Sequence, residues 1–536
     1  MNRHGSRGPV LAGVLGAALS VSALACSGNV ITEKPGGTGG DGGGSGTTDT
    51  TAFQGKTNKV DLLLAIDNSR SMGDKQDILA VAVPDLVARL VNPPCLDGQG
   101  KPAAVPPGFG PLDACPDGTQ REHIPVLDIH VGIVSSSLGG HGSDACSSSA
   151  AGKQSNNDRA HLLARKDPAS FDEVETYQGL KFLAWDPAQT LSPPGEADLD
   201  VDTASDANMT ALVPSLREMV LGVGQIGCGY EAQMEAWYRF LVDPTPPEEV
   251  TIDDNGAVLL KGTDKVLLAQ RKAFLRPDSA LAIVVLSDED DCSIRESGQY
   301  YYVAQLKGQA GGAFHLPAAR AVCSVAPGDE CCYSCGQSGP KDANGNPICP
   351  DDPSCKGADG NVVYYGDLDD HINVRCFDQK RRFGIDFLYP IDRYVSALTE
   401  KTVIDRNGEV VPNPIYSDLD PSDEIFQVRD PSLVLLAGIV GVPWQDIART
   451  NANGVARSVA GIDFNGKATG GFKNAEELGL PLPGEDSATW DVILGDPGEL
   501  QASPRSADDP QHRPALGEEP DHGRRFAVSP SPSETR

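Results

Sequence analysis

The chain has 536 residues, and its 75 acidic side chains against 44 basic ones give a formal net charge of −31. Such an acidic surface repels nucleic acid and anionic lipid and attracts divalent cations and basic partners, so nucleic acid is excluded as a ligand. Thirteen cysteines are unusual in the cytosol and favour an oxidising compartment.

The N-terminus has the layout of a secretory signal peptide over residues 1–25. Arg3 and Arg7 precede an apolar stretch from Val10 to Ala25, which is too short to serve comfortably as a membrane span. The stretch ends in Leu24-Ala25-Cys26, which resembles a bacterial lipoprotein box. The resemblance implies cleavage before Cys26, a lipid on this cysteine, and anchoring in the cell envelope at the outer membrane or cell surface. Residues 26–55 then form a Gly-rich tether.

The segment at residues 60–73, VDLLLAIDNSRSMG, carries most of the functional information. Its apolar run predicts a buried parallel strand, and Asp67, Ser69 and Ser71 follow at the strand end. Hard oxygen donors of this kind suit Mg²⁺, Mn²⁺ or Ca²⁺. The apolar spacing from Lys75 to Leu90 predicts a helix that Pro84 kinks or breaks. The competing interpretation of the motif is a serine-rich turn that caps this helix without metal.

Further strands and helices follow along the chain. Asp-x-Asn-Gly strings begin at Asp253, Asp342, Asp405 and Asp463; they predict tight turns, the first and third within β-hairpins. Periodicity predicts strands at Leu127 to Val134, Leu180 to Trp185, Leu281 to Leu286 and residues 432–442, and helices at Met209 to Val220, Val266 to Leu275 and Ile385 to Leu398.

Two more loops carry oxygen donors. The strand ending at Leu286 runs into an acidic turn that contains Asp288, for which an exposed, solvated turn is the alternative. The loop at residues 227–231 precedes an amphipathic helix and ends in Glu231. Glu231 either supplies a ligand oxygen or simply begins the helix, where a carboxylate favours the dipole.

Twelve cysteines remain after Cys26, an even number that suits six disulfides. Their regional parity predicts Cys95–Cys115, Cys146–Cys228 and four bridges within residues 292–376, with Cys228–Cys292 as the main alternative. A zinc site is the competing interpretation of the cluster around Cys331-Cys332. We expect residues 292–382 to be a disulfide-stapled insertion without an apolar core of its own.

The D-x-S-x-S segment resembles the metal-ion-dependent adhesion site of von Willebrand factor A (VWA) domains. The resemblance implies an α/β fold, a doubly wound, mostly parallel sheet flanked by helices, over residues 56–445. Residues 446–536 form a C-terminal extension, and its Pro, Ser and mixed charge predict disorder after about 503. The resemblance also implies that Ser69 and Ser71 bind the cation directly, that Asp67 acts mostly through water, and that Asp288 completes the site. The family threonine is absent, and Glu231 is the candidate substitute. A sixth position is left for a partner's carboxylate.

Three functions follow from these features. The first is a lipid-anchored binding module that holds an unknown protein ligand, through an acidic side chain, by way of Mg²⁺, Mn²⁺ or Ca²⁺. The second is a structural envelope protein with a vestigial site, and the third is a metal-dependent enzyme. The sequence has no His-Glu-x-x-His, no Gly-x-Ser-x-Gly and no phosphate-binding loop, so we expect no catalytic activity.

Overall fold

The computed structural model describes residues 59–149, 152–168, 172–199, 211–367, 370, 372, 375–419 and 428–441. The predicted signal peptide, Cys26, the tether, the turn at Asp463 and the C-terminal extension therefore lie outside the described residues.

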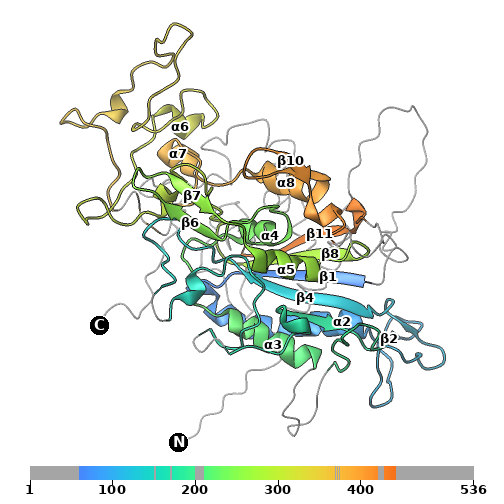
Figure 1. The fold of residues 1–536 in the computed structure, drawn as a ribbon. Coiled ribbons are helices and arrows are strands. Elements are labelled where there is room, and N and C mark those ends of the chain that lie inside the picture. The colour runs from blue at the N-terminus through green and yellow to red at the C-terminus, as the bar shows by residue number, and fades with distance from the viewer. Residues whose placement is uncertain are drawn as a thin grey trace, which may run out of the picture.

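A five-stranded sheet forms the centre of the fold, in the order β11-β8-β1-β4-β5 (Figure 1). Strands β1, β4, β8 and β11 are parallel to their neighbours, whereas β5 runs antiparallel to β4 at one edge. The strands span Lys59–Ile66 (β1), Asp128–Ser135 (β4), Phe182–Trp185 (β5), Ala280–Ser287 (β8) and Val434–Val440 (β11). The prediction of a mostly parallel α/β sheet is confirmed.

Helices cover both faces of this sheet (Figure 1). On one face Val83 and Val87 of α2 pack with Leu62 and Leu64 of β1, together with residues of α3. On the other face the cluster contains Leu63 of β1 and side chains of α4, α5 and α8. The helices span Gly73–Val91 (α2), Leu212–Val223 (α3), Gln233–Leu241 (α4), Lys265–Phe274 (α5) and Ile391–Thr399 (α8).

A proline affects two of the predicted helices. Of the kink or break predicted at Pro84, the break is absent, because helix α2 continues through this residue. Buried valines on both sides of the proline hold the helix on the sheet. The helix predicted from Ile385 begins only at Ile391, directly after Pro390. Proline disfavours the helical conformation in the residue before it, so the helix starts after it.

A buried ionic cluster fixes the N-terminal half of β1. The Asp61 carboxylate is fully buried and accepts hydrogen bonds from Arg276 Nε (2.8 Å), from the Arg429 guanidinium (2.9 Å) and from the Ser279 hydroxyl. Burial opposes ionisation, but the charges of Arg276 and Arg429 outweigh it and lower the pKa of Asp61. This cluster joins β1 to segments more than 200 residues away in the chain.

All twelve cysteines after Cys26 form disulfides, which leaves no thiolate for the zinc alternative. The pairs are Cys95–Cys115, Cys146–Cys228, Cys292–Cys376, Cys323–Cys332, Cys331–Cys349 and Cys335–Cys355. The first two join the cysteines that regional parity pairs, and the other four lie within the insertion. The alternative Cys228–Cys292 pairing is not observed.

The insertion buries apolar side chains in a cluster that it shares with the main body. This third hydrophobic cluster combines Val303, Ala304 and Leu316 of the insertion with Cys228 and Tyr230. The short helices Val322–Val325 (α6) and Gln379–Phe383 (α7) belong to this lobe, which extends away from the sheet (Figure 1). Its aromatic residues come in runs without helical or strand spacing, which is why periodicity did not reveal the cluster.

Three two-stranded antiparallel sheets lie outside the central sheet. None of the described helices is long and apolar enough to span a membrane. The predicted turns at Asp253 and Asp405 each join the two strands of one of these sheets, as a hairpin. The strand pairs are β2–β3 (Cys95–Leu96 and Gln120–Arg121), β6–β7 (Glu249–Ile252 and Val258–Lys261) and β9–β10 (Thr402–Ile404 and Val410–Pro412).

Candidate metal centre

The site begins where β1 and β8 end side by side. Asp67 is the first residue after β1, and its backbone N–H donates to the carbonyl of Leu286 on β8 (2.8 Å). The Asp67 carboxylate is fully buried; Oδ1 accepts from the Ser69 N–H (2.7 Å) and Oδ2 from the Ser287 hydroxyl (2.7 Å). Backbone and side chain are therefore held in place from both strands.

The two serines of the motif face the acidic turn after β8. Ser69 Oγ lies 2.8 Å from Ser71 Oγ, which in turn lies 3.0 Å from Asp288 Oδ1 and 2.8 Å from Glu289 Oε1. A serine hydroxyl has one proton, whereas an ionised carboxylate only accepts. Ser69 can donate its own proton to Ser71, but Ser71 has one proton for the two carboxylates of Asp288 and Glu289. The cluster therefore has more acceptors than donors.

Glu231 reaches the same cluster from the loop before α4. Its side chain is almost fully buried. Burial, and after it the negative charges of Glu289 and Asp67, raise the pKa of Glu231 to about 8. A carboxylate that crowds against other carboxylates in this way is neutralised by a proton or by a cation.

The carboxyl groups of Asp67 and Glu289 also have raised pKa values. Burial raises the pKa of Asp67 despite the hydrogen bonds from Ser287 and Ser69, and the charge of Asp288 raises it further. Partial desolvation and the charges of Asp67, Asp288 and Asp290 raise the pKa of Glu289. The positive charge nearest to Asp288 among the described contacts is the Lys75 ammonium, 2.9 Å from Oδ2.

The structure thus brings together Asp67, Ser69, Ser71, Asp288 and Glu231, the set named from the sequence. Exposure rises across the set, from the fully buried Asp67 to the exposed Ser71. One side of the oxygen cluster therefore faces solvent.

Sequence reasoning missed several neighbours: Ser287, Glu289, Lys75, Gln233 and Ser136. The Gln233 amide is hydrogen-bonded to Ser287 Oγ (2.7 Å), and Ser136 Oγ lies 3.2 Å from Asn68 Oδ1. A signal for Ser136 was present, because it follows the predicted strand at residues 127–134 at the same sheet edge. Glu289 could have been chosen as readily as Asp288, its neighbour in the acidic turn.

The donor set fits a hard divalent cation by its chemistry. Hydroxyl and carboxylate oxygens are the ligands that Mg²⁺, Mn²⁺ and Ca²⁺ prefer. No group of three or more His, Cys, Asp or Glu side chains within the described part of the chain is arranged to hold a metal ion. A cation at this edge would therefore depend on the serine hydroxyls as well as on Asp67 and Asp288.

No protein-family model matches the chain, and neither a curated protein nor a solved structure matches it.

Proposed function

We propose that this chain is a cell-envelope lipoprotein whose VWA-like domain binds a protein partner through a divalent cation held by Asp67, Ser69, Ser71, Asp288 and Glu231. The observation that carries the proposal is the surplus of oxygen acceptors around Ser71 at the adjoining ends of β1 and β8. A bound cation supplies the positive charge that this cluster lacks and a coordination position for an oxygen of the partner.

The topology supports this location. The chain passes from β1 to β4 and β5 on one side, and then returns to place β8 and β11 on the other. The strand order therefore reverses between β1 and β8. In open α/β sheets, ligands bind outside the carboxyl ends of the strands at this reversal. Asp67 and Asp288 follow the two strands that flank it.

The roles of the individual residues follow from their positions. Asp67 is buried and already accepts two hydrogen bonds, so it suits a contact through water, as the VWA resemblance implies. Ser69 and Ser71 present hydroxyl oxygens, and Asp288 lies beside them on the exposed side. Glu231 is the candidate substitute for the threonine that the resemblance implies, and its proton would leave when a cation binds.

A structural protein with a vestigial site is the second candidate, and one contact favours it. The Lys75 ammonium pairs with Asp288 (2.9 Å) and donates to the Ser71 carbonyl (2.9 Å). An internal cation that neutralises the acidic turn lowers the gain from a metal ion. Lys75→Met should therefore strengthen cation binding if the site is functional.

Isothermal titration of the mature protein with Mg²⁺, Mn²⁺ and Ca²⁺ tests the proposal. We expect one binding site in the wild type and none in the double variant Ser69→Ala/Ser71→Ala. The matched control is Ser147→Ala/Ser149→Ala, since this second Ser-x-Ser pair has the same Oγ–Oγ distance of 2.8 Å away from the strand ends. Absence of heat with all three cations would favour the vestigial site.

The envelope anchor and the partner need separate tests. Cys26→Ala should leave the precursor unlipidated, which mass spectrometry and detergent partitioning report; identical masses and soluble fractions for both forms would contradict the lipoprotein assignment. Partner capture from envelope extracts should disappear with EDTA and with Ser69→Ala/Ser71→Ala, whereas EDTA-resistant capture would point to another surface.

A further inference from the structure

The insertion and the β6–β7 hairpin enclose a groove of about 920 Å³. Its lining residues come mainly from residues 299–309, called the first wall here, from residues 314–317 and 334–337, called the second wall, and from Ile252 of β6. Figure 1 shows the hairpin beside the lobe that carries α6 and α7. The volume of the groove is in the range of sites that hold small ligands.

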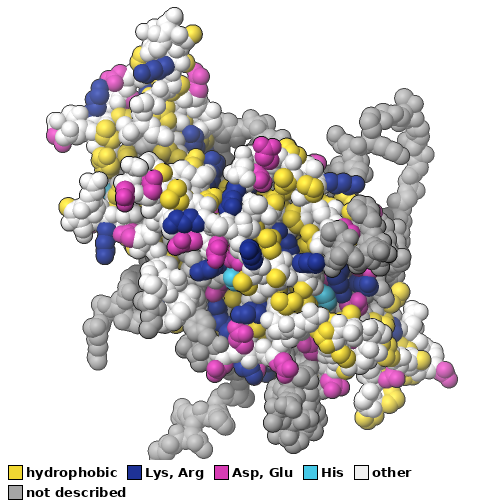
Figure 2. Space-filling view, in the orientation of Figure 1, with side chains coloured by type: hydrophobic (Ala, Val, Ile, Leu, Met, Phe, Trp, Pro, Cys, Tyr) yellow, Lys and Arg dark blue, Asp and Glu magenta, His cyan; other side chains and the backbone are white. Residues whose placement is uncertain are grey.

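Aromatic rings and amides dominate the lining. The rings are Tyr300, Tyr301, Tyr302, Phe314, Tyr364 and Phe387, and the amides are Gln299, Gln305, Gln309 and Gln337. None of the described residues that line the groove is Asp or Glu, and Lys307 is the one charged side chain among them. This contrasts with the acidic chain as a whole and with the face in Figure 2, where acidic and basic side chains are dispersed. The groove therefore suits an uncharged ligand.

A buried guanidinium holds the two walls in fixed positions. Arg375 is almost fully buried and pairs with Asp370 (2.9 Å). It donates to the carbonyls of Val303 (3.2 Å), Gln305 and Phe314, while Asp370 also accepts from the Leu316 N–H (3.0 Å). Both walls are thus tied to one ion pair, and the groove is formed before any ligand arrives.

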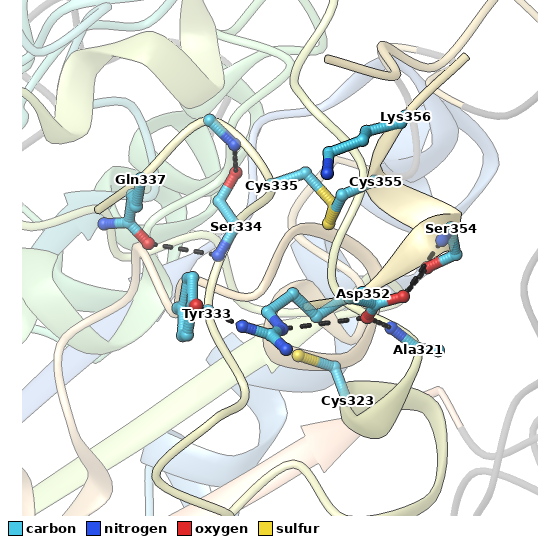
Figure 3. The surroundings of a disulfide bond; sticks show 12 residues. Ala321, Cys323, Tyr333, Ser334, Cys335, Gln337, Asp352, Ser354, Cys355 and Lys356 are labelled. Atoms are coloured by element: carbon cyan, nitrogen blue, oxygen red, sulfur yellow. Dashed lines mark hydrogen bonds and ion pairs between the residues drawn. A yellow bond between two sulfur atoms is a disulfide. The ribbon is translucent and has the colours of Figure 1, made fainter. Parts of the chain in front are cut away.

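A disulfide also holds the part of the second wall at residues 334–337. Figure 3 shows Cys335–Cys355 beside Gln337, whose Oε1 accepts from the Ser334 N–H (3.1 Å). A site that is rigid before binding loses little conformational entropy when a ligand enters it.

We propose that this groove binds a neutral oligosaccharide. A pyranose ring has apolar C–H faces that stack on aromatic rings, and its hydroxyls are donors and acceptors at once, as are glutamine amides. Proline-rich peptides also use aromatic grooves, but they offer few donors to a wall of amides. Tyr301 and Phe387 are buried, and the amides of Gln305 and Gln337 are already hydrogen-bonded within the protein. The surface that a ligand meets therefore combines the partly exposed rings of Tyr300, Tyr302, Phe314 and Tyr364 with the exposed Gln299 and Gln309, and this combination favours the sugar.

The proposal is tested on the full-length mature protein. The probes are chitohexaose, cellohexaose and maltohexaose, and a proline-rich decapeptide represents the alternative class of ligand. Isothermal titration should show binding of at least one oligosaccharide, unchanged by EDTA because the groove contains no part of the metal centre. Tyr364 is 59% exposed, so Tyr364→Ala should fold normally and weaken binding about tenfold.

Two controls separate stacking from general damage. Tyr364→Phe keeps the ring and should bind within about twofold of the wild type, as should Phe109→Ala, which removes an aromatic ring from the other cysteine-bounded loop. Binding of the decapeptide but of no oligosaccharide, or binding of neither, would overturn the proposal. Oligosaccharide binding that is lost with EDTA would move the ligand to the metal centre.

Discussion

The hydroxyl of Ser287, the last residue of β8, donates a hydrogen bond of 2.7 Å to the carboxylate of Asp67, the first residue after β1. This contact joins the ends of two strands that are more than 200 residues apart in the chain and holds a fully buried carboxylate in place. The Gln233 amide contacts the same hydroxyl (2.7 Å). Asp67, at the inner side of the oxygen cluster, is therefore held by the sheet, whereas Ser71 and Asp288, at its outer side, belong to loops.

The variant Asp67→Asn should separate the cost of the buried charge from the gain by a cation. In EDTA it should unfold at the same temperature as the wild type or slightly higher, because it removes a charge that burial and Asp288 disfavour. Wild-type protein should gain about 2.7 kcal/mol at a hundredfold excess of cation over Kd, and the variant should gain none. Melting curves in Mg²⁺, Mn²⁺, Ca²⁺ and EDTA measure both; equal gains in the two proteins would contradict the assignment of Asp67.

Removing the Cys146–Cys228 bridge should weaken both the fold and the metal centre. The bridge spans 82 residues, so Cys146→Ser/Cys228→Ser should lose about 4.5 kcal/mol of unfolding free energy in urea. It also holds the loop that leads to Glu231, so cation affinity should fall. Cys95→Ser/Cys115→Ser is the matched control; it spans 20 residues, should lose about 3 kcal/mol and should keep its cation affinity.

Arg429→Ala should be among the most destabilising single changes. The Arg429 side chain is buried; besides Asp61, it donates to the carbonyls of Ser279 (2.9 Å) and Ile415 (3.0 Å). Its removal leaves buried acceptors and a buried carboxylate less well paired, which costs about 3 to 5 kcal/mol. Lys356→Ala, which breaks the exposed pair with Asp351 (3.0 Å), should cost less than about 1 kcal/mol in the same urea titration.

The buried His130 should make the protein less stable in mild acid. Burial, and after it the charge of Arg276, lower the pKa of His130 from 6.5 to about 4. The unfolded chain therefore binds this proton more readily, so the stability that neutral His130 contributes is complete above pH 6.5 and is lost as the pH falls through 4. The full effect is on the order of 3 kcal/mol. In His130→Asn the unfolding free energy should change less between pH 4 and 6.5 than in the wild type. An equal change with pH in the two proteins would refute the role of His130.

The strands, and the approach of Asp67, Ser69 and Ser71 to Asp288 at the candidate site, could be predicted because both depend on local patterns. An apolar run that ends in Asp67-x-Ser69-x-Ser71 marks a buried strand and its polar end, and the run before Asp288 does the same. The antiparallel direction of β5 could not be read from residues 180–185, since a short apolar run is the same in either direction. The pairing of Lys75 with Asp288 depends on the approach of a helix to a distant loop, which no spacing encodes.

The insertion was the least predictable part for a related reason. Its cysteines indicated a stapled segment, but the run Tyr300 to Tyr302 has neither helical nor strand periodicity. These rings line a groove only because Arg375 and Asp370, about 70 residues further on, hold the backbone around them. A sequence pattern indicates which face of a single helix or strand is buried. The groove is instead formed where several irregular segments meet, and no such pattern marks it.

The central position of β1 has a consequence for how the protein acquires its fold. The first strand of the domain pairs with β4 and β8. Its Asp61 accepts a hydrogen bond from Arg429, which lies 368 residues later in the chain. Contacts this distant in sequence form slowly, because a long loop must close before they stabilise anything. The second neighbour of β1, strand β8, ends at Ser287, so one edge of β1 stays unpaired until about half of the 536 residues have been made. We expect newly made chains to present this edge during that time, and an unpaired strand edge readily pairs with another chain.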